Sequence, residues 1–199
     1  GCGVVGVYNH PEAAKLAYLA LYALQHRGQE SAGIAAFDGK RINLQKGNGL
    51  VSDIFTPEKL DKLPGLNAIG HVRYSTTGSG ATYNAQPLHG NYRGGHISVA
   101  HNGNLTNADE LARAVEANGA IFQSTTDSEL LIHLIAQNRA HDFQEVLETS
   151  LRRLKGAYSM TMLRDDQMYA IKDPRGWRPL CLGSLPGNAW VGWPEDVSA

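Results

Sequence analysis

Residues 2–8 read CGVVGVY, and this run of apolar and β-branched side chains predicts a buried strand at the start of the chain. Residues 11–26 follow with a proline in the first turn and apolar side chains at helical spacing, which predicts a helix that packs on the strand. We expect the core face of this helix to consist of Leu16, Leu19, Ala20, Ala23 and Leu24. The fold therefore begins with a strand followed by an amphipathic helix.

Further strands occur in groups, with helices between the groups. Strands are predicted at residues 32–37, 41–46, 67–74, 97–100, 157–163 and 168–172. Helices are predicted after Thr56-Pro57, after capping-box patterns at Asn107 and Thr126, and over residues 142–154. This grouping favours an α+β fold with mostly antiparallel sheets and helices on their outer faces, in one domain over residues 1–199. The polar stretch 75–95 predicts a long loop.

Composition excludes several classes of protein. Eighteen Lys and Arg residues balance 19 Asp and Glu residues, so the chain has no electrostatic footprint for nucleic acid or an anionic membrane. Its two cysteines, Cys2 and Cys181, exclude a disulfide framework and suit a reducing cytosol, where Cys181 is expected to be an inert core thiol. We expect a cytoplasmic protein with no membrane or nucleic-acid partner, no metal site and no cofactor in this chain.

Two strings carry reactive groups. Cys2 near the chain start is either a small buried hydrophobe or a nucleophile, since a thiol with a nearby base is strongly nucleophilic at neutral pH. The amide of Asn102 and the backbone N–H of Gly103 form either a common Asn-Gly turn or two donors that converge on an oxyanion.

Three other charged positions have both a functional and an ordinary interpretation. Arg27 and Gly28 form either a helix C-terminus or a fixed cation beside an exposed carbonyl. Arg73 at a strand end either forms a surface ion pair or holds a carboxylate substrate with its planar guanidinium. Asp127 either stabilises a helix N-terminus or pairs with a substrate ammonium group.

Together with other strings along the chain, these residues resemble the class II glutamine amidotransferases, which are N-terminal-nucleophile (Ntn) hydrolases. The strings are CGVVG at 2–6, LQHRGQESAGI at 24–34, GNGLVSDIF at 47–55, IGHVRYSTTG at 69–78, NAQP at 84–87, AHNGNLTNADEL at 100–111, TTDSELL at 125–131, LKGAYS at 154–159 and DPRGWRPLCLG at 173–183. LQHRGQ, GLVSD and DPRGWRPL look most like the glutaminase domains of amidophosphoribosyltransferases. The resemblance implies a four-layer αββα sandwich.

The resemblance also implies catalytic roles. Cys2 would attack the side-chain amide carbon of L-glutamine and form a glutamyl thioester, while its own α-amine relays the thiol proton to ammonia. Asn102 and the N–H of Gly103 would bind the oxyanion, and Arg27 and Gly28 would fix the amine and thiol of the nucleophile. Hydrolysis of the thioester would yield glutamate. The ammonia would supply phosphoribosylamine synthesis in de novo purine biosynthesis.

Substrate-binding roles follow in the same way. Arg73 would bind the α-carboxylate of glutamine with Thr76 beside it, and Asp127 would bind the α-ammonium group. The resemblance implies a phosphoribosyltransferase domain as partner in the full-length enzyme, which would be a homo-oligomer. That domain is expected to be absent from this chain, and Mg²⁺ is expected only there.

Two departures from the family pattern leave alternatives open. Gly1 precedes Cys2, whereas family members begin at this cysteine, and Gly1 could be a tag remnant, an unprocessed residue or an engineered block. With Gly1 in place we expect greatly reduced glutaminase activity. Trp193-Pro194 interrupts the smooth strand that the family has near this position. The alternatives are the glutaminase domain of another class II amidotransferase and a catalytically silent glutamine-binding module blocked by Gly1.

Overall fold

The computed structural model describes residues 2–25, 30–74 and 82–193. Its strands are β1 (Gly3–Tyr8), β2 (Ser31–Phe37), β3 (Ile42–Asn48), β4 (Asn67–Arg73), β5 (Leu88–Tyr92), β6 (Gly95–Leu105), β7 (Gly156–Arg164), β8 (Gln167–Lys172), β9 (Cys181–Leu185) and β10 (Ala189–Trp193). Its helices are α1 (Ala13–Leu24), α2 (Val51–Ile54), α3 (Pro57–Asp61), the short 3₁₀ helix η2 (Thr82–Asn84), α4 (Ala108–Ala117), α5 (Ser128–Gln137) and α6 (Phe143–Arg152).

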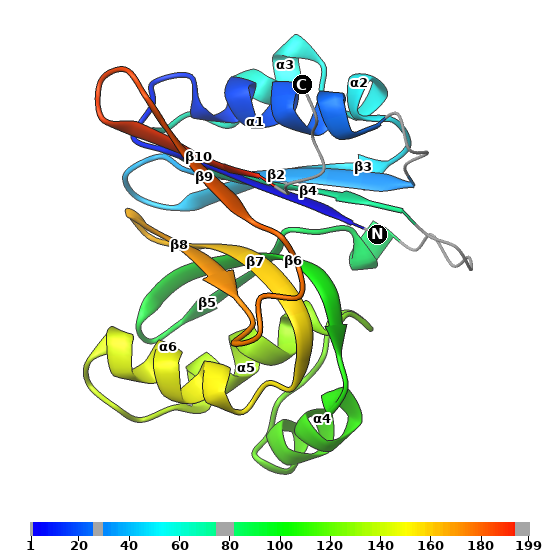
Figure 1. The fold of residues 1–199 in the computed structure, drawn as a ribbon, viewed down its shortest axis with the longest axis vertical. Coiled ribbons are helices and arrows are strands. Elements are labelled where there is room, and N and C mark those ends of the chain that lie inside the picture. Colours follow the sequence, from blue (N-terminus) through cyan, green and yellow to red (C-terminus); the bar gives the residue numbers. More distant parts are fainter. Residues whose placement is uncertain (1, 26–29, 75–81, 194–199) are drawn as a thin grey trace.

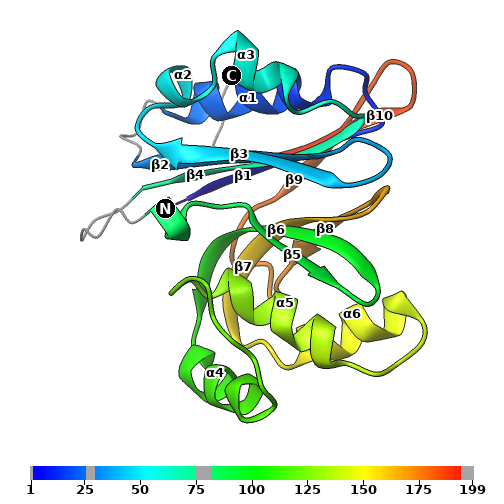
Figure 2. The same cartoon turned by 180° about the vertical axis from the view of Figure 1, so that it is seen from behind.

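Two β-sheets lie face to face, and helices cover both outer surfaces (Figure 1). Among the described residues the first sheet has the order β3-β2-β4-β1-β10-β9 and the second the order β5-β6-β7-β8, with antiparallel pairing throughout. Helices α1 to α3 lie over the first sheet and α4 to α6 over the second, as the reverse view also shows (Figure 2). The predicted αββα fold is confirmed.

Three apolar clusters hold the layers together. One packs α1 against the first sheet, and another packs α4, α5 and α6 against the second. The third lies between the sheets and contains Val4, Ala35, Ile42, Ile69, Ala100 and Leu163. β1 lies between β4 and β10 in the first sheet, and its N-terminal end lies beside the space between the two sheets (Figure 1).

The predicted core face of α1 is right for Leu24, which is buried, and for Leu16 and Ala20, which pack against the core while partly buried, but it is wrong for Leu19. Its buried residues are Ala13, Ala14, Ala17, Leu21 and Leu24, whereas Leu19 is exposed. Small alanines bring the helix close to the sheet, and strand glycines receive its leucines. A Cβ added to Gly70 would lie 2.9 Å from Cδ1 of Leu21. Close packing on glycine therefore overrides the pattern of the larger side chains.

Three other expectations change. β6 extends to Leu105, so Asn102 and Gly103 lie within a strand rather than after one, and the expected loop 75–95 contains η2 and β5. Neither capping box forms as predicted, because the side chains of Asn107 and Glu129 accept backbone N–H groups of neighbouring loops instead. Cys181 is half-buried in β9 and does not belong to the described core.

Within the described ranges, none of the helices is both long and apolar enough to cross a membrane.

Candidate active site

Cys2 directly precedes β1, and the N-terminal end of this strand lies at one edge of the space between the sheets (Figure 1). Cys2 is half-buried, and its backbone N–H donates a hydrogen bond of 3.3 Å to Oδ1 of Asn102 on β6. Gly3 pairs with Val72 in the antiparallel pairing of β1 with β4. Arg73 follows Val72 at the end of β4, and Cys2 precedes Gly3, so the two residues come next to each other at this end of the strands. Because the donor is an N–H group, the amide oxygen of Asn102 must face Cys2, and its Nδ2 group stays free to donate elsewhere.

The edge of β6 explains why Gly103 presents a backbone donor. β5 pairs with β6 only as far as Val99, so beyond this point β7 covers one side of the strand alone. The N–H of His101 donates to Oε1 of Gln86 at 2.8 Å, and the N–H of Leu105 donates to Oδ2 of Asp127 at 3.2 Å. Since alternate residues of a strand point their N–H groups the same way, the N–H of Gly103 faces the same open edge between them.

A side chain cannot be accommodated at Gly103. This residue has φ of 135°, a left-handed conformation that favours glycine, and an added Cβ would overlap the carbonyl of Ala157 on β7. Backbone shape and close packing therefore both require glycine at the position whose N–H faces the open edge.

Asp127 comes to the same edge from the start of α5. It is half-buried, and burial raises the pKa of its carboxyl. The hydrogen bond from the N–H of Leu105 lowers this pKa in part, and the negative charge of Asp109 raises it further. The carboxylate makes no hydrogen bond to its own helix. It therefore does not act as the side-chain cap that was its ordinary interpretation, and one face of it is available to a ligand cation.

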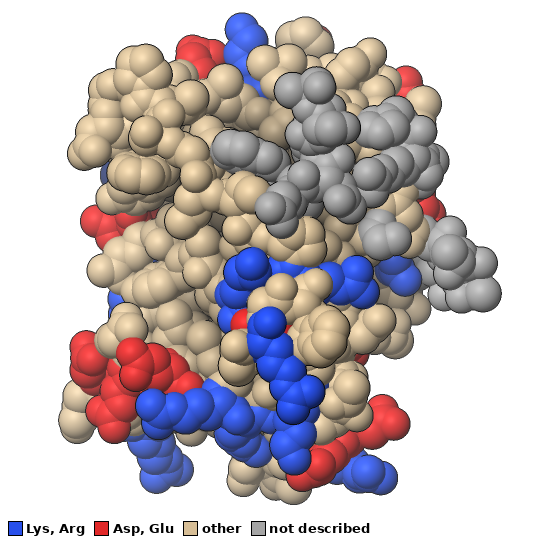
Figure 3. Space-filling view, in the orientation of Figure 1, with Lys and Arg blue, Asp and Glu red and all other residues tan. Residues whose placement is uncertain are grey.

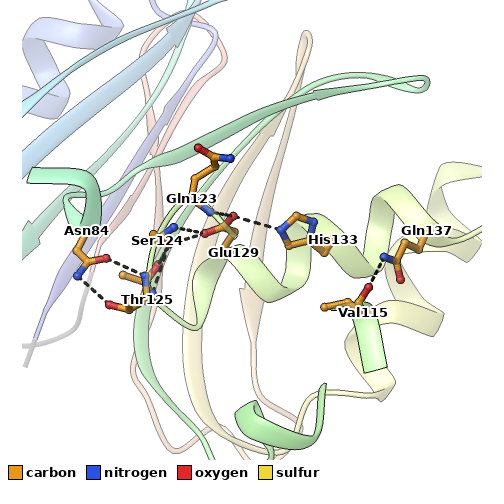
Figure 4. Close-up of polar contacts among 9 residues, drawn as sticks. Asn84, Val115, Gln123, Ser124, Thr125, Glu129, His133 and Gln137 are labelled. Carbon is orange, nitrogen blue, oxygen red and sulfur yellow. Dashed lines mark hydrogen bonds and ion pairs between the residues drawn. The ribbon is translucent and has the colours of Figure 1, made fainter. Parts of the chain in front are cut away.

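A buried carboxylate holds the loop before Asp127 in place (Figure 4). Glu129 accepts the N–H groups of Gln123 at 2.7 Å and Ser124 at 2.8 Å, the Ser124 hydroxyl at 2.6 Å and Nε2 of His133 at 3.2 Å. Burial raises the pKa of this carboxyl, but the hydrogen bonds outweigh burial, so its pKa lies below the ordinary value. Glu129 is thus a charged anchor for the loop that presents Asp127.

Two buried histidines lie at the edge of β6, His101 on the strand itself and His71 on β4. Nε2 of His71 lies 2.9 Å from the carbonyl oxygen of His101, so this nitrogen carries the proton and donates. Burial lowers the pKa of His71 to about 3 and that of His101 to about 4, assisted by the positive charges of Arg73 and Arg178 respectively. Both rings are therefore neutral at pH 7.

This pair makes stability sensitive to acid. Histidine in the unfolded chain titrates near its ordinary value of 6.5, well above the folded values of about 3 and about 4. At pH values between the folded and the unfolded pKa values, the unfolded chain therefore binds more protons than the folded chain. The free energy of unfolding consequently falls as pH decreases from about 6.5 toward about 4. We expect a lower melting temperature at pH 5 than at pH 7.5 by circular dichroism, and a smaller difference in His71→Gln. Identical differences in both chains would contradict this.

The structure places Cys2 against Asn102, with Gly103 next to Asn102 on β6. Arg73 ends β4 beside the start of β1, and Asp127 contacts Leu105 further along β6. The remaining predicted site residues, Arg27, Gly28 and Thr76, lie outside the described residues. In the parts of the chain that the structure describes, no cluster of His, Cys, Asp and Glu could hold a metal ion.

Sequence reasoning assigned no role to Gln86 or His71, and it placed Glu129 in a capping box with Thr126 and not beside the site. All three are polar residues that become buried beside the site. A signal was present, because His71 interrupts the apolar strand at 67–74 and Gln86 belongs to the quoted NAQP string. Their partners are distant in sequence, however, and no local pattern predicts those contacts.

Comparison with known proteins decides the family. Residues 71–192 match the family described as "Glutamine amidotransferase domain", and this range includes Arg73, Asn102, Gly103 and Asp127. The chain belongs to this family. The predicted class II glutamine amidotransferase is therefore confirmed.

Two relatives of this glutamine amidotransferase domain are named amidophosphoribosyltransferase. The chain is 50% identical over 192 residues to amidophosphoribosyltransferase 1, chloroplastic, of Arabidopsis thaliana, covering 96% of this chain and 34% of the relative. It is 44% identical over 191 residues to amidophosphoribosyltransferase of Bacillus subtilis, covering 96% of this chain and 40% of the relative. The chain thus spans less than half the length of either relative.

A solved structure shares the fold of this glutamine amidotransferase domain. Glutamine phosphoribosylpyrophosphate amidotransferase from B. subtilis, complexed with ADP and GMP, superimposes with a TM-score of 0.90 at 42% identity. The match covers 96% of this chain and 41% of that one. A high TM-score over nearly the whole chain confirms the layered arrangement of the two sheets.

Proposed function

We propose that this chain hydrolyses the side-chain amide of L-glutamine to glutamate and ammonia through a thioester on Cys2. The observation that carries the proposal is the hydrogen bond of 3.3 Å from the backbone N–H of Cys2 to Oδ1 of Asn102. It supports the proposal because Cys2 carries a thiol, and Asn102 and its neighbour carry the two donors that we propose for the oxyanion. Those donors are Nδ2 of Asn102 and the N–H of Gly103.

The reaction has two balanced steps. The Cys2 thiol attacks the amide carbon, its proton passes to the leaving nitrogen, the C–N bond breaks and ammonia departs, leaving a glutamyl thioester. Water then attacks the thioester carbon, the C–S bond breaks and the thiol is restored as glutamate leaves. Asn102 and Gly103 stabilise the negative oxygen that forms in both steps. Arg27 and Gly28 are proposed to fix the amine and thiol of Cys2.

The substrate is held by its two charged ends. Arg73 binds the α-carboxylate with Thr76 beside it, and Asp127 binds the α-ammonium group with the carboxylate face that Leu105 leaves free. On one face of the molecule, Lys and Arg side chains gather in the middle of the view, and Lys, Arg, Asp and Glu side chains are mixed below them (Figure 3).

The names of the relatives support a wider role. Because they are amidophosphoribosyltransferases, we propose that the ammonia serves phosphoribosylamine synthesis in purine biosynthesis, with a phosphoribosyltransferase domain as partner in a homo-oligomer. Mg²⁺ would be needed only by that partner domain. The B. subtilis relative supports a cytoplasmic location, whereas the Arabidopsis relative is named chloroplastic.

Direct assay tests the proposal. The chain beginning at Cys2 should release glutamate and ammonia in equal amounts from L-glutamine, and Cys2→Ala should not. Cys181→Ala is the matched control, since the second thiol is half-buried in β9, and it should retain activity. Tight glutamine binding without product release would instead indicate a silent binding module.

Substrate-binding variants should alter KM more than kcat. Arg73→Ala and Asp127→Ala each remove one charge-assisted contact to groups that do not react, and such contacts contribute about 1.5–3 kcal/mol. We therefore expect KM for glutamine to rise about 10- to 100-fold with a smaller change in kcat. Steady-state kinetics measure both constants. A fall in kcat at unchanged KM would show that Arg73 and Asp127 do not bind the charged ends of glutamine.

A further inference from the structure

We propose that Gln86 and His71 are positioning residues that replace a missing strand partner at the open edge of β6 and so set the orientation of the oxyanion donors. This proposal rests on the proposed glutaminase function. Neither residue is placed to touch the substrate in the roles given above, and both act through the backbone of His101.

The two side chains occupy both backbone groups of one residue. Oε1 of Gln86 accepts the N–H of His101 at 2.8 Å, and Nε2 of His71 donates to its carbonyl oxygen at 2.9 Å. In an antiparallel sheet one residue of a neighbouring strand would exchange both bonds with His101. Here β5 has already ended its pairing at Val99, so a side chain from β4 and one from the loop before β5 do this instead.

Both side chains are buried, so the two bonds cannot be exchanged readily for water. Gln86 is 6% exposed and His71 is fully buried. Loss of either partner would leave a buried N–H or C=O group of His101 unsatisfied, which costs free energy and favours a shift of the strand. Asn102 directly follows His101 on β6, and Gly103 is the residue after Asn102.

The segment that carries Gln86 is itself anchored on several sides. Nζ of Lys46 on β3 donates to the carbonyl of Ala85 at 2.7 Å. Asn84 exchanges two hydrogen bonds with Thr125, donating to its hydroxyl and accepting its N–H, each at 2.9 Å (Figure 4). A Cβ on Gly33 of β2 would overlap the Gln86 carbonyl, so the segment also lies directly on the first sheet. Gln86 therefore has little freedom to move with β6.

We expect displacement of the β6 edge to slow the chemical step of glutamine hydrolysis. A displaced β6 edge misaligns Asn102 and Gly103 with the developing oxyanion, and a misplacement of about 1 Å can cost about 10²-fold in rate. Arg73, proposed to bind the α-carboxylate, is the last residue of β4, two residues beyond His71. Asp127, proposed to bind the α-ammonium group, lies at the start of α5 and contacts β6 at Leu105, four residues beyond His101. Asn102 and Gly103 directly follow His101, so we expect kcat to fall and KM for glutamine to change less.

Paired variants test this in the chain that begins at Cys2. Gln86→Leu removes the acceptor, whereas Gln86→Glu keeps an oxygen in its place. His71→Phe removes the donor, whereas His71→Gln keeps an N–H. Ser98→Ala is the control. Ser98 lies on β6, the same strand as His101, and its hydroxyl donates a buried hydrogen bond of 3.0 Å to the carbonyl of Leu88 on β5, so the variant deletes a buried hydrogen bond away from His101. Each variant is assayed for kcat, KM and melting temperature.

We expect kcat to fall about 10- to 100-fold in Gln86→Leu and His71→Phe, with recovery in Gln86→Glu and His71→Gln. Ser98→Ala should lower the melting temperature without this fall. Equal kcat in Gln86→Leu and the parent would overturn the inference, as would a fall that the conservative variants do not reverse or that Ser98→Ala reproduces. A parent chain without glutaminase activity would instead refute the proposed function.

Discussion

Asn102→Ala is expected to lower kcat for glutamine hydrolysis by about 10²- to 10³-fold, the usual cost of removing one oxyanion donor. KM should change much less, because the amide contacts charge that develops only as the thiol attacks. The same side chain also holds the backbone nitrogen of Cys2 at 3.3 Å, so its loss affects both donor and nucleophile. Steady-state kinetics on the chain beginning at Cys2 measure the change.

A second substitution separates these two effects. Asn102→Asp keeps an oxygen for the Cys2 N–H but places a negative carboxylate where the donor was, so it should be at least as inactive as alanine. Asn104→Ala is the matched control, because Asn104 is an exposed asparagine on the same strand, and it should behave as the parent. A change confined to KM in Asn102→Ala would contradict the oxyanion assignment.

Removal of Gly1 is expected to raise the glutaminase rate by about 10²- to 10⁴-fold, the typical contribution of a positioned general base. With Gly1 attached, the nitrogen of Cys2 belongs to a peptide bond and cannot accept a proton. In the chain beginning at Cys2 it is an α-amine with an ordinary pKa of about 7.7–8.0, so part of it is an available base at neutral pH. The structure places this nitrogen against Oδ1 of Asn102, which would orient the amine.

Both chains should be compared under the same conditions. Initial rates from pH 6 to 9 measure the effect, and intact mass confirms the first residue of each chain. Equal melting temperatures would show that the difference lies in chemistry and not in folding. Equal rates with and without Gly1 would show that the α-amine is not the base.

Local sequence patterns predicted the elements that depend on local chemistry. Asp38-Gly39, a dipeptide that favours a tight turn between strands, connects β2 and β3, and Thr56 caps α3 with its side chain as Thr-Pro predicts. The spacing of Leu130, Leu131 and Leu134 indicates one apolar helix face, and α5 buries all three. In each case neighbouring residues determine the outcome, so a single sequence suffices.

Features that depend on distant partners could not be predicted in this way. The buried face of α1 follows from strand glycines such as Gly70, and the extent of β6 follows from pairing with β7, not from its own residues. At the site, the residue types of Cys2, Asn102 and Gly103 indicated chemistry. Their convergence, and the roles of Gln86 and His71, depend on contacts between two sheets that no local spacing encodes.

The central claim is that Cys2 is the nucleophile of a glutamine site, and covalent labelling tests it most directly. The chain beginning at Cys2 is treated with diazo-oxo-norleucine, an electrophilic analogue of glutamine, and the modified residue is identified by peptide mass spectrometry. We expect one label per chain, on Cys2, that excess L-glutamine prevents and Cys2→Ala abolishes. A label on Cys181, or a folded chain that stays unlabelled, would contradict the claim.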